Sequence, residues 1–236
     1  MNRVLVVGAS SGIGAATAKL LAREAQVFAL ARRSERLEEL GKNVVSIPFD
    51  VTRLNEIDGL LKTLTKEHGR FLSLVYCAGV QLIKPVKLLV PEELETIFKV
   101  NFYAPLFFAR AFAARSVHEK ENPSIVFVSS IASLKPEKGV LPYSASKAAL
   151  ENLSRGLALE IAPIRVNCVA PGFLKTEMTN QFSKIYNDAF IEKIASEYPL
   201  GLGSPEKVAN LIRFLISKEA DYITGESIRI DGGGAL

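Results

Sequence analysis

Short apolar runs alternate with longer amphipathic stretches along the whole chain. The runs are rich in Val, Ile, Leu and Phe without a regular polar alternation, which is typical of strands buried on both faces of a parallel sheet. They predict strands at Val4–Val7, Val27–Ala31, Val44–Phe49, Leu72–Cys77, Ser124–Val128, Ile164–Val169 and Ser227–Ile230.

The stretches between these runs mostly have helical spacing. Pro91 is a favoured first-turn residue and opens a helical pattern to about His118, in which Pro105 predicts a break or kink. Ser204-Pro205-Glu206 has the composition of a helix N-terminus. Helices are therefore predicted at Ile13 to about Glu24, Asn55–His68, Pro91–His118, Tyr143–Ala162 and from Ser204 to about Ser217, with a charged segment at Arg32–Leu40.

Strands separated by helical crossovers predict a doubly wound, Rossmann-type sheet. We expect one domain over residues 1–236, with seven mostly parallel strands and helices on both faces. Residues from about 173 to 203 have irregular helical spacing and could form a lid over a site, part of the core or a subunit interface. Their large side chains are Phe173, Leu174, Met178, Phe182, Ile185, Tyr186, Phe190, Ile194 and Tyr198.

Composition narrows the class of protein. With 48% hydrophobic and 23% charged residues, the chain has the composition of an ordinary soluble globular protein. The net charge of +4 comes without a Lys/Arg run, so no nucleic-acid partner is predicted. The two cysteines, Cys77 and Cys168, lie far apart in sequence without a C-x-x-C, and the two histidines each lie on a polar helical stretch. Neither a metal site nor a disulfide framework is therefore predicted. No signal-peptide or membrane-spanning pattern is present, so we expect a cytoplasmic protein without a membrane partner.

A glycine-rich loop joins the first strand to the first helix. It reads Gly8-Ala9-Ser10-Ser11-Gly12-Ile13-Gly14, at the place where a doubly wound sheet binds a pyrophosphate on a helix N-terminus. Gly8 would permit a tight turn. Gly12 and Gly14 would let the backbone approach the phosphate and the helix approach the strand closely. The spacing differs from the common G-x-G-x-x-G pattern, and a purely structural turn is the alternative. No Gly-Lys-Ser/Thr follows, which disfavours a nucleoside-triphosphate loop.

The end of the second strand bears on the choice of nucleotide. NAD sites place an acidic residue there, whereas this chain has Arg32 and Arg33 with no carboxylate before Glu35. A guanidinium suits a 2′-phosphate through charge-assisted bidentate bonds. NADP(H) is therefore the preferred cofactor, with NAD(H) still open and two solvated arginines as the alternative.

A tyrosine and a lysine lie one helical turn apart at Tyr143 and Lys147. Side chains four residues apart on a helix lie on one face, and small residues separate these two. A nearby ammonium favours the phenolate and would lower the tyrosine pKa from about 10 towards the range useful for general acid catalysis. Taken alone, the pair is equally compatible with a solvated helix start.

In combination, the glycine-rich loop, Asn101, Ser130, Tyr143 and Lys147 resemble the short-chain dehydrogenase/reductase family, of its smaller type. The resemblance covers the chain from Val4 to Gly233. In that family a serine lies thirteen residues before the tyrosine, which selects Ser130 over Ser129. Ser129 would then face the interior or support the loop.

The resemblance implies a role for each of these side chains. Tyr143 would be the proton donor, or the base in the reverse direction, and Ser130 would hold the substrate carbonyl. Lys147 would bind the nicotinamide ribose and lower the tyrosine pKa, and Asn101 would hold a water-linked proton relay to Lys147.

Further cofactor contacts are implied by position. Asp50-Val51 would contact the adenine, Cys77-Ala78-Gly79 would line the loop after the fourth strand, and Pro171-Gly172 with Thr176 would hold the carboxamide. Tyr76-Cys77 departs from the family, which usually has two asparagines there, and so puts loop geometry in doubt.

The implied reaction is NADP(H)-dependent hydride transfer between the nicotinamide and a carbonyl or secondary alcohol. The substrate would be a 3-oxoacyl thioester, as in 3-oxoacyl-[acyl-carrier-protein] reductases, or another apolar ketone in a pocket with Leu134, Val140 and Leu141. An acyl carrier protein is then a candidate partner. The alternatives are a reductase of small ketones, aldehydes or diketones, and a non-catalytic nucleotide-binding regulatory or scaffold protein. A homotetramer or homodimer would form on the Pro91–His118 and Tyr143–Ala162 helices.

Overall fold

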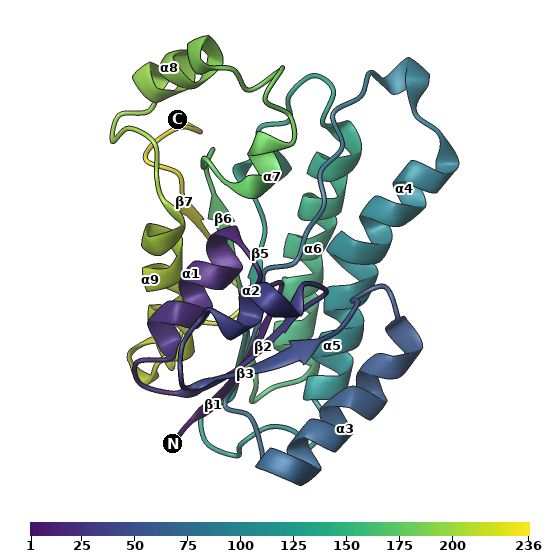
Figure 1. The fold of residues 1–236 in the computed structure, drawn as a ribbon, viewed down its shortest axis with the longest axis vertical. Coiled ribbons are helices and arrows are strands. Elements are labelled where there is room, and N and C mark those ends of the chain that lie inside the picture. The colour runs from purple at the N-terminus through teal and green to yellow at the C-terminus, as the bar shows by residue number, and fades with distance from the viewer.

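The computed structural model describes residues 1–236 and contains one sheet of seven strands, all parallel (Figure 1). The strand order is β3-β2-β1-β4-β5-β6-β7, so the predicted single Rossmann-like domain is confirmed. The strands are β1 Arg3–Val7, β2 Gln26–Ala31, β3 Val44–Pro48, β4 Ser73–Tyr76, β5 Ser124–Val128, β6 Arg165–Pro171 and β7 Ser227–Ile230.

Helices cover both faces of this sheet. Figure 1 shows α1 and α9 on one side and α3, α5 and α6 on the other. The helices are α1 Gly12–Leu21, α2 Ser34–Glu38, α3 Ile57–His68, α4 Pro91–Phe98, α5 Ala104–Phe112, α6 Leu141–Glu160, α7 Glu177–Asn180, α8 Asp188–Glu197 and α9 Pro205–Ile216.

Alternate strand residues supply two separate apolar cores. Leu5 and Val7 pack with the cluster beneath α3, α5 and α6, whereas Val4 and Val6 pack with the cluster beneath α1 and α9. Successive side chains of a strand point to opposite faces, and both faces are covered here. This explains why the strands read as continuous apolar runs rather than as a polar-apolar alternation.

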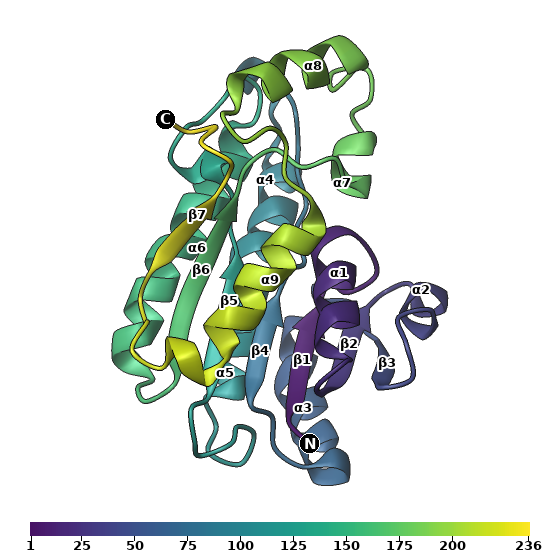
Figure 2. The ribbon, with the colours of Figure 1, turned by 90° about the vertical axis from the view of Figure 1, so that its left-hand side faces the viewer.

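The carboxyl ends of the parallel strands all meet at one edge of the sheet. The N-terminus lies at the opposite end of the molecule from α7 and α8, as Figure 2 shows. Connections leave in opposite directions from neighbouring β1 and β4, which makes this pair the switch point where such sheets bind ligands. The fold therefore directs the site to the end covered by α7 and α8.

The prediction of one long helix from Pro91 to His118 is wrong in the middle of this range and at its end. A π-helical segment at Lys99–Tyr103 separates α4 from α5, and α5 ends at Phe112. Pro105 is the second residue of α5, where its missing N–H costs no helical bond. The irregularity predicted at Pro105 therefore lies in the turn just before it.

No helix of the structure is both long enough and apolar enough to span a membrane.

Candidate active site

A cavity of about 640 Å³ opens at the carboxyl edge of the sheet. Its size lies in the range of small-molecule sites. Of the residues predicted for the site, all but Asn101 line it: Gly8, Ser10, Ser11, Gly12, Ile13, Gly14, Arg32, Arg33, Asp50, Val51, Cys77, Ala78, Gly79, Ser130, Tyr143, Lys147, Pro171, Gly172 and Thr176.

The glycine-rich loop is shaped for close approach of backbone to backbone. Gly8 has φ +85°, and a Cβ atom there would clash with the backbone of Ala78. A Cβ atom on Gly14 would clash with the carbonyl of Gly8. The Ser11 hydroxyl at the N-cap of α1 accepts no capping bond, which leaves the first amides of the helix to a ligand. The loop therefore fits a dinucleotide pyrophosphate.

Tyr143 and Lys147 both point from the first turns of α6 into the cavity. The Lys147 ammonium lies 5.7 Å from the centre of the Tyr143 ring. It is 4% exposed and donates a hydrogen bond of 2.8 Å to the carbonyl of Val128, at the end of β5. Sheet and helix together therefore determine where this charge lies.

The expected lowering of the Tyr143 pKa by Lys147 is wrong in this structure. Burial raises the pKa of Tyr143 to about 12, although an interaction with Ser130 acts in the opposite direction. Burial also lowers the pKa of Lys147 to about 8. Loss of hydration disfavours the charged form of each group, which raises the pKa of a tyrosine and lowers that of a lysine.

Ser130 and Ser129 make different contacts. Ser130 lines the cavity and its Oγ accepts a 3.2 Å bond from the Ala132 N–H. Ser129 is buried and donates a 2.8 Å hydrogen bond to the Glu151 carboxylate. The same carboxylate oxygen accepts a 2.6 Å bond from Ser133. Glu151 thus anchors both sides of the loop that presents Ser130.

Asn101 lies in the π-helical segment and holds two elements together. Its amide donates to the Val80 carbonyl at 2.9 Å and to the Ser146 hydroxyl at 3.0 Å, and its oxygen accepts from the Val80 N–H. Tyr76 fixes the preceding residue, because its hydroxyl donates a 2.8 Å bond to the Val100 carbonyl. Tyr76 therefore links the end of β4 to the π-helical segment.

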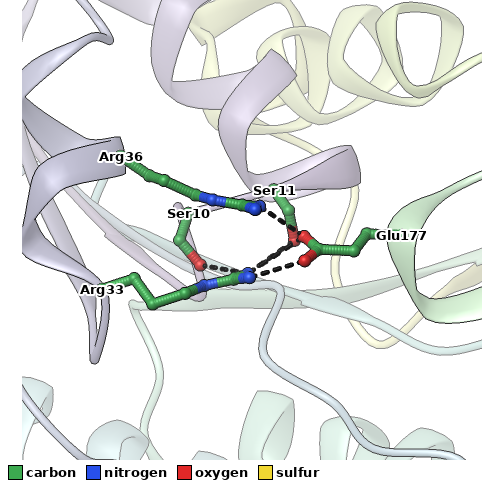
Figure 3. A network of polar contacts seen from close by, with 5 residues as sticks. All are labelled: Ser10, Ser11, Arg33, Arg36 and Glu177. Atoms are coloured by element: carbon green, nitrogen blue, oxygen red, sulfur yellow. Dashed lines mark hydrogen bonds and ion pairs between the residues drawn. The ribbon is translucent and has the colours of Figure 1, made fainter. Parts of the chain in front are cut away.

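At the end of the cavity beside β2 and β3, Asp50 and Arg33 occupy separate positions. Asp50 accepts two bonds from Thr52, at 2.9 Å from its N–H and 2.8 Å from its hydroxyl. These bonds, with Arg32 and Arg53 nearby, lower the pKa of the Asp50 carboxyl. Asp50 is therefore an ionised acceptor at neutral pH. Arg33 instead extends towards the glycine-rich loop and pairs with Glu177 on α7 (Figure 3).

The apolar wall of the cavity differs from the expected one. Val140, Phe173, Leu174, Met178, Tyr186 and Tyr198 line it. Leu134 and Leu141 do not, and are 60% and 52% exposed. Leu141 lies two residues before Tyr143 on α6, about 200° away around the helix, so the two side chains cannot face the same cavity. Phe190 packs on the Phe173 and Tyr186 rings from behind, with centroids 5.7 and 5.1 Å away.

Comparison with known proteins bears on the whole chain. The family model described as enoyl-(acyl carrier protein) reductase matches residues 8–234. A 3-oxoacyl-[acyl-carrier-protein] reductase from Thermotoga maritima is 35% identical over 97% of this chain and 96% of its own. The chain is a short-chain dehydrogenase/reductase.

Other relatives of this short-chain dehydrogenase/reductase have different names. A diacetyl reductase [(S)-acetoin forming] from Staphylococcus epidermidis is 32% identical over 97% of this chain and 96% of its own. A short-chain dehydrogenase/reductase structure from Brucella melitensis superposes with a TM-score of 0.92 at 27% identity, covering 100% of this chain and 97% of that one. An actinorhodin polyketide ketoreductase with NADPH superposes with a TM-score of 0.91 at 26% identity, covering 99% and 97%. The oxidoreductase class is therefore shared by relatives named for different substrates.

Two site residues of this short-chain dehydrogenase/reductase were missed by sequence reasoning. Glu151 follows Tyr143 and Lys147 at the same four-residue spacing, which places it on their face of α6 and could have revealed it. Glu177 had no such local signal, because its partner Arg33 lies 144 positions away. No group of three or more His, Cys, Asp or Glu side chains is placed to hold a metal ion.

Proposed function

We propose that this short-chain dehydrogenase/reductase is a cytoplasmic, NADP(H)-dependent reductase of a 3-oxoacyl thioester or another apolar ketone. The observation that carries the proposal is the convergence of Ser130, Tyr143 and Lys147 on one cavity with the glycine-rich loop. A nucleotide-binding loop alone would serve a scaffold protein equally well. Hydroxyl donors beside a buried ammonium are the chemistry that proton transfer to an oxygen requires.

The bound cofactor would supply the hydride, and the residues of the cavity would prepare the carbonyl for it. The Ser130 hydroxyl would donate a hydrogen bond to the carbonyl oxygen and hold it beside Tyr143. With its pKa raised to about 12, Tyr143 keeps its proton at neutral pH and can donate it to the developing alkoxide. Lys147 would bind the nicotinamide ribose, whose hydroxyls would replace part of the hydration that the ammonium loses on burial. The charged ammonium would then stabilise the Tyr143 phenolate left after proton transfer.

Asn101 would support this proton transfer from outside the cavity. A Cβ atom placed on Gly79 would lie 3.5 Å from both the Asn101 oxygen and the Lys147 ammonium, so both groups border the same small space. A water relay to Lys147 would use this space. The three hydrogen bonds of the Asn101 side chain also hold the loop after β4 against α6.

The preference for NADP(H) rests on Arg32 and Arg33, which line the cavity at the end of β2. We expect the wild type to have a higher kcat/KM with NADPH than with NADH. Arg32→Asp should reverse the preference, by about tenfold or more, since it replaces a phosphate ligand with a ribose-hydroxyl acceptor and repels the 2′-phosphate.

The matched control for this experiment is Arg23→Asp, which makes the same charge change on an exposed residue outside the cavity. It should leave the cofactor preference unchanged. A wild type that prefers NADH would contradict the role assigned to the arginines.

A panel of carbonyls would identify the substrate class. The lining side chains Phe173, Met178 and Tyr186 are large and apolar, which favours a 3-oxoacyl thioester or a bulky ketone. The similarity to a diacetyl reductase supports a second candidate, a small diketone. NADPH oxidation should be fastest with one of these two classes. Cofactor binding without turnover on the whole panel would instead support a regulatory or scaffold protein.

Assembly into a dimer or tetramer, and docking of an acyl carrier protein, belong to the same proposal. On the outward side of α4 and the π-helical segment, Leu94 and Tyr103 are exposed and border a hollow that also includes Leu54 and Phe98. On α6, Leu159 is exposed as well. Apolar side chains gathered on the two predicted interface helices favour association there.

A further inference from the structure

Glu177 is the first residue of α7, and its ion pairs connect this helix to the residues that follow β2. Its two carboxylate oxygens accept bonds from Arg33 at 2.6 and 3.0 Å, and one of them accepts a 2.6 Å bond from Arg36 (Figure 3). The Arg33 contact is therefore bidentate, the geometry in which a guanidinium also binds a phosphate.

Arg33 lies where the 2′-phosphate of a bound dinucleotide would be recognised. Its guanidinium crosses from the end of β2 to the glycine-rich loop and donates to the Ser10 hydroxyl at 3.1 Å. In doubly wound sheets the adenosine ribose lies between these same two segments. The Glu177 carboxylate thus occupies the donors of Arg33 that a 2′-phosphate would need.

We propose that Glu177 is a specificity-determining residue that competes with the 2′-phosphate of NADP(H) for Arg33. The inference rests on the proposed function, because it assumes a dinucleotide in this cavity. The competition weakens NADP(H) binding relative to a chain with a free Arg33, and leaves NAD(H) binding unaffected.

Arg36 provides a place for the displaced carboxylate. It contacts Glu177 but does not line the cavity, whereas Arg33 does. The carboxylate can therefore keep Arg36 while Arg33 turns to the phosphate. Hydrogen bonds from Arg33 lower the pKa of Glu177 to about 2, with Arg36 and Ser11 adding to the effect, so the competing charge is present throughout the physiological pH range.

The competition can be measured with nucleotide fragments, without turnover. The probes are 2′,5′-ADP, which carries the phosphate in question, and 5′-AMP, which lacks it. Calorimetric titration of Glu177→Gln should show 2′,5′-ADP bound about two- to fivefold more tightly than by the wild type, the scale of partly exposed ion pairs. The affinity for 5′-AMP should not change.

Two comparisons separate this competition from a general gain of positive charge. Glu35→Gln removes the same charge from an exposed residue of α2 that makes no ion pair, and should leave both affinities unchanged. In an Arg33→Gln background, Glu177→Gln should no longer improve 2′,5′-ADP binding, because the two residues act through one contact. An improvement that persists in that background overturns the inference.

The outcomes also distinguish the inference from the function on which it rests. If the wild type binds 2′,5′-ADP more tightly than 5′-AMP and Glu177→Gln leaves that affinity unchanged, the inference alone fails. If the wild type does not discriminate between the two probes, the preference for NADP(H) fails and the inference fails with it.

Discussion

The two ends of the cavity are built in opposite ways. At the end that holds Tyr143, Lys147 and Asn101 are almost fully buried and are held by hydrogen bonds to the strand end, the loop after β4 and α6. At the end beside β2, the side chains of Arg33, Arg36 and Glu177 are 43%, 47% and 35% exposed, and their ion pairs join α2 to α7.

The difference follows from what each end must do. A reaction requires donors held in position and shielded from water, because a small displacement or a hydrated charge costs rate. Choice between NAD(H) and NADP(H) requires only that charges meet at the surface, where ion pairs are weak and exchange easily. Substitutions at the buried end should therefore change chemistry and stability strongly, and those at the exposed end should mainly change cofactor choice.

The largest expected effect is at Tyr143. Tyr143→Phe should lower kcat by about 10²- to 10⁴-fold, since it removes the proton donor, and should leave the affinity for NADPH nearly unchanged. Steady-state kinetics with the best substrate of the panel, together with a fluorescence titration of NADPH, would check both parts. Tyr222→Phe removes a hydroxyl from a fully exposed tyrosine and is the matched control. Turnover of Tyr143→Phe close to that of the control would refute the mechanism.

Replacing Lys147 with methionine should abolish activity and increase stability. Burial lowers its pKa from 10.5 to about 8, a shift that corresponds to about 3 kcal/mol of destabilisation below pH 8. Lys147→Met removes this destabilisation. It also leaves the Val128 carbonyl without its donor, which lowers the free energy of unfolding by roughly 1 kcal/mol or more. The variant should therefore unfold at higher urea concentration at pH 7 and lack turnover.

The pH dependence of this gain has a definite sign. Between pH 8 and pH 10.5 the unfolded chain holds a proton on Lys147 that the folded chain has released, so the stability contributed by this group rises with pH. The stability difference between Lys147→Met and the wild type should shrink over that range. A difference that stays constant from pH 7 to pH 10 would show that the lysine is not desolvated in solution.

The smallest effect is expected at the exposed end. Glu177→Gln should change the free energy of unfolding by less than about 1 kcal/mol, because its ion pairs are more than a third exposed and screened by solvent. Urea denaturation at low salt would measure the change, and added salt should reduce it further. A loss of several kcal/mol would mean that the two ends are not built differently.

Much of the site could be predicted because its signals are local. The spacing of Ser130, Tyr143 and Lys147 and the order of glycines from Gly8 to Gly14 lie within short stretches of chain, and the apolar runs reflect a sheet covered on both faces. Local geometry follows from local sequence whenever a helix or a strand sets the spacing. These features predicted the fold and the family, and they predicted the side chains that the structure brings to one cavity.

Tertiary structure alone decided the remaining features. The raised pKa of Tyr143 depends on how much water the packed cavity excludes, and the pairing of Arg33 with Glu177 joins positions 144 residues apart. Likewise, Leu134 and Leu141 turned outward because a helix start and a short turn set their direction. Desolvation and long-range pairing are properties of the assembled surface, so no run of residues determines them by itself.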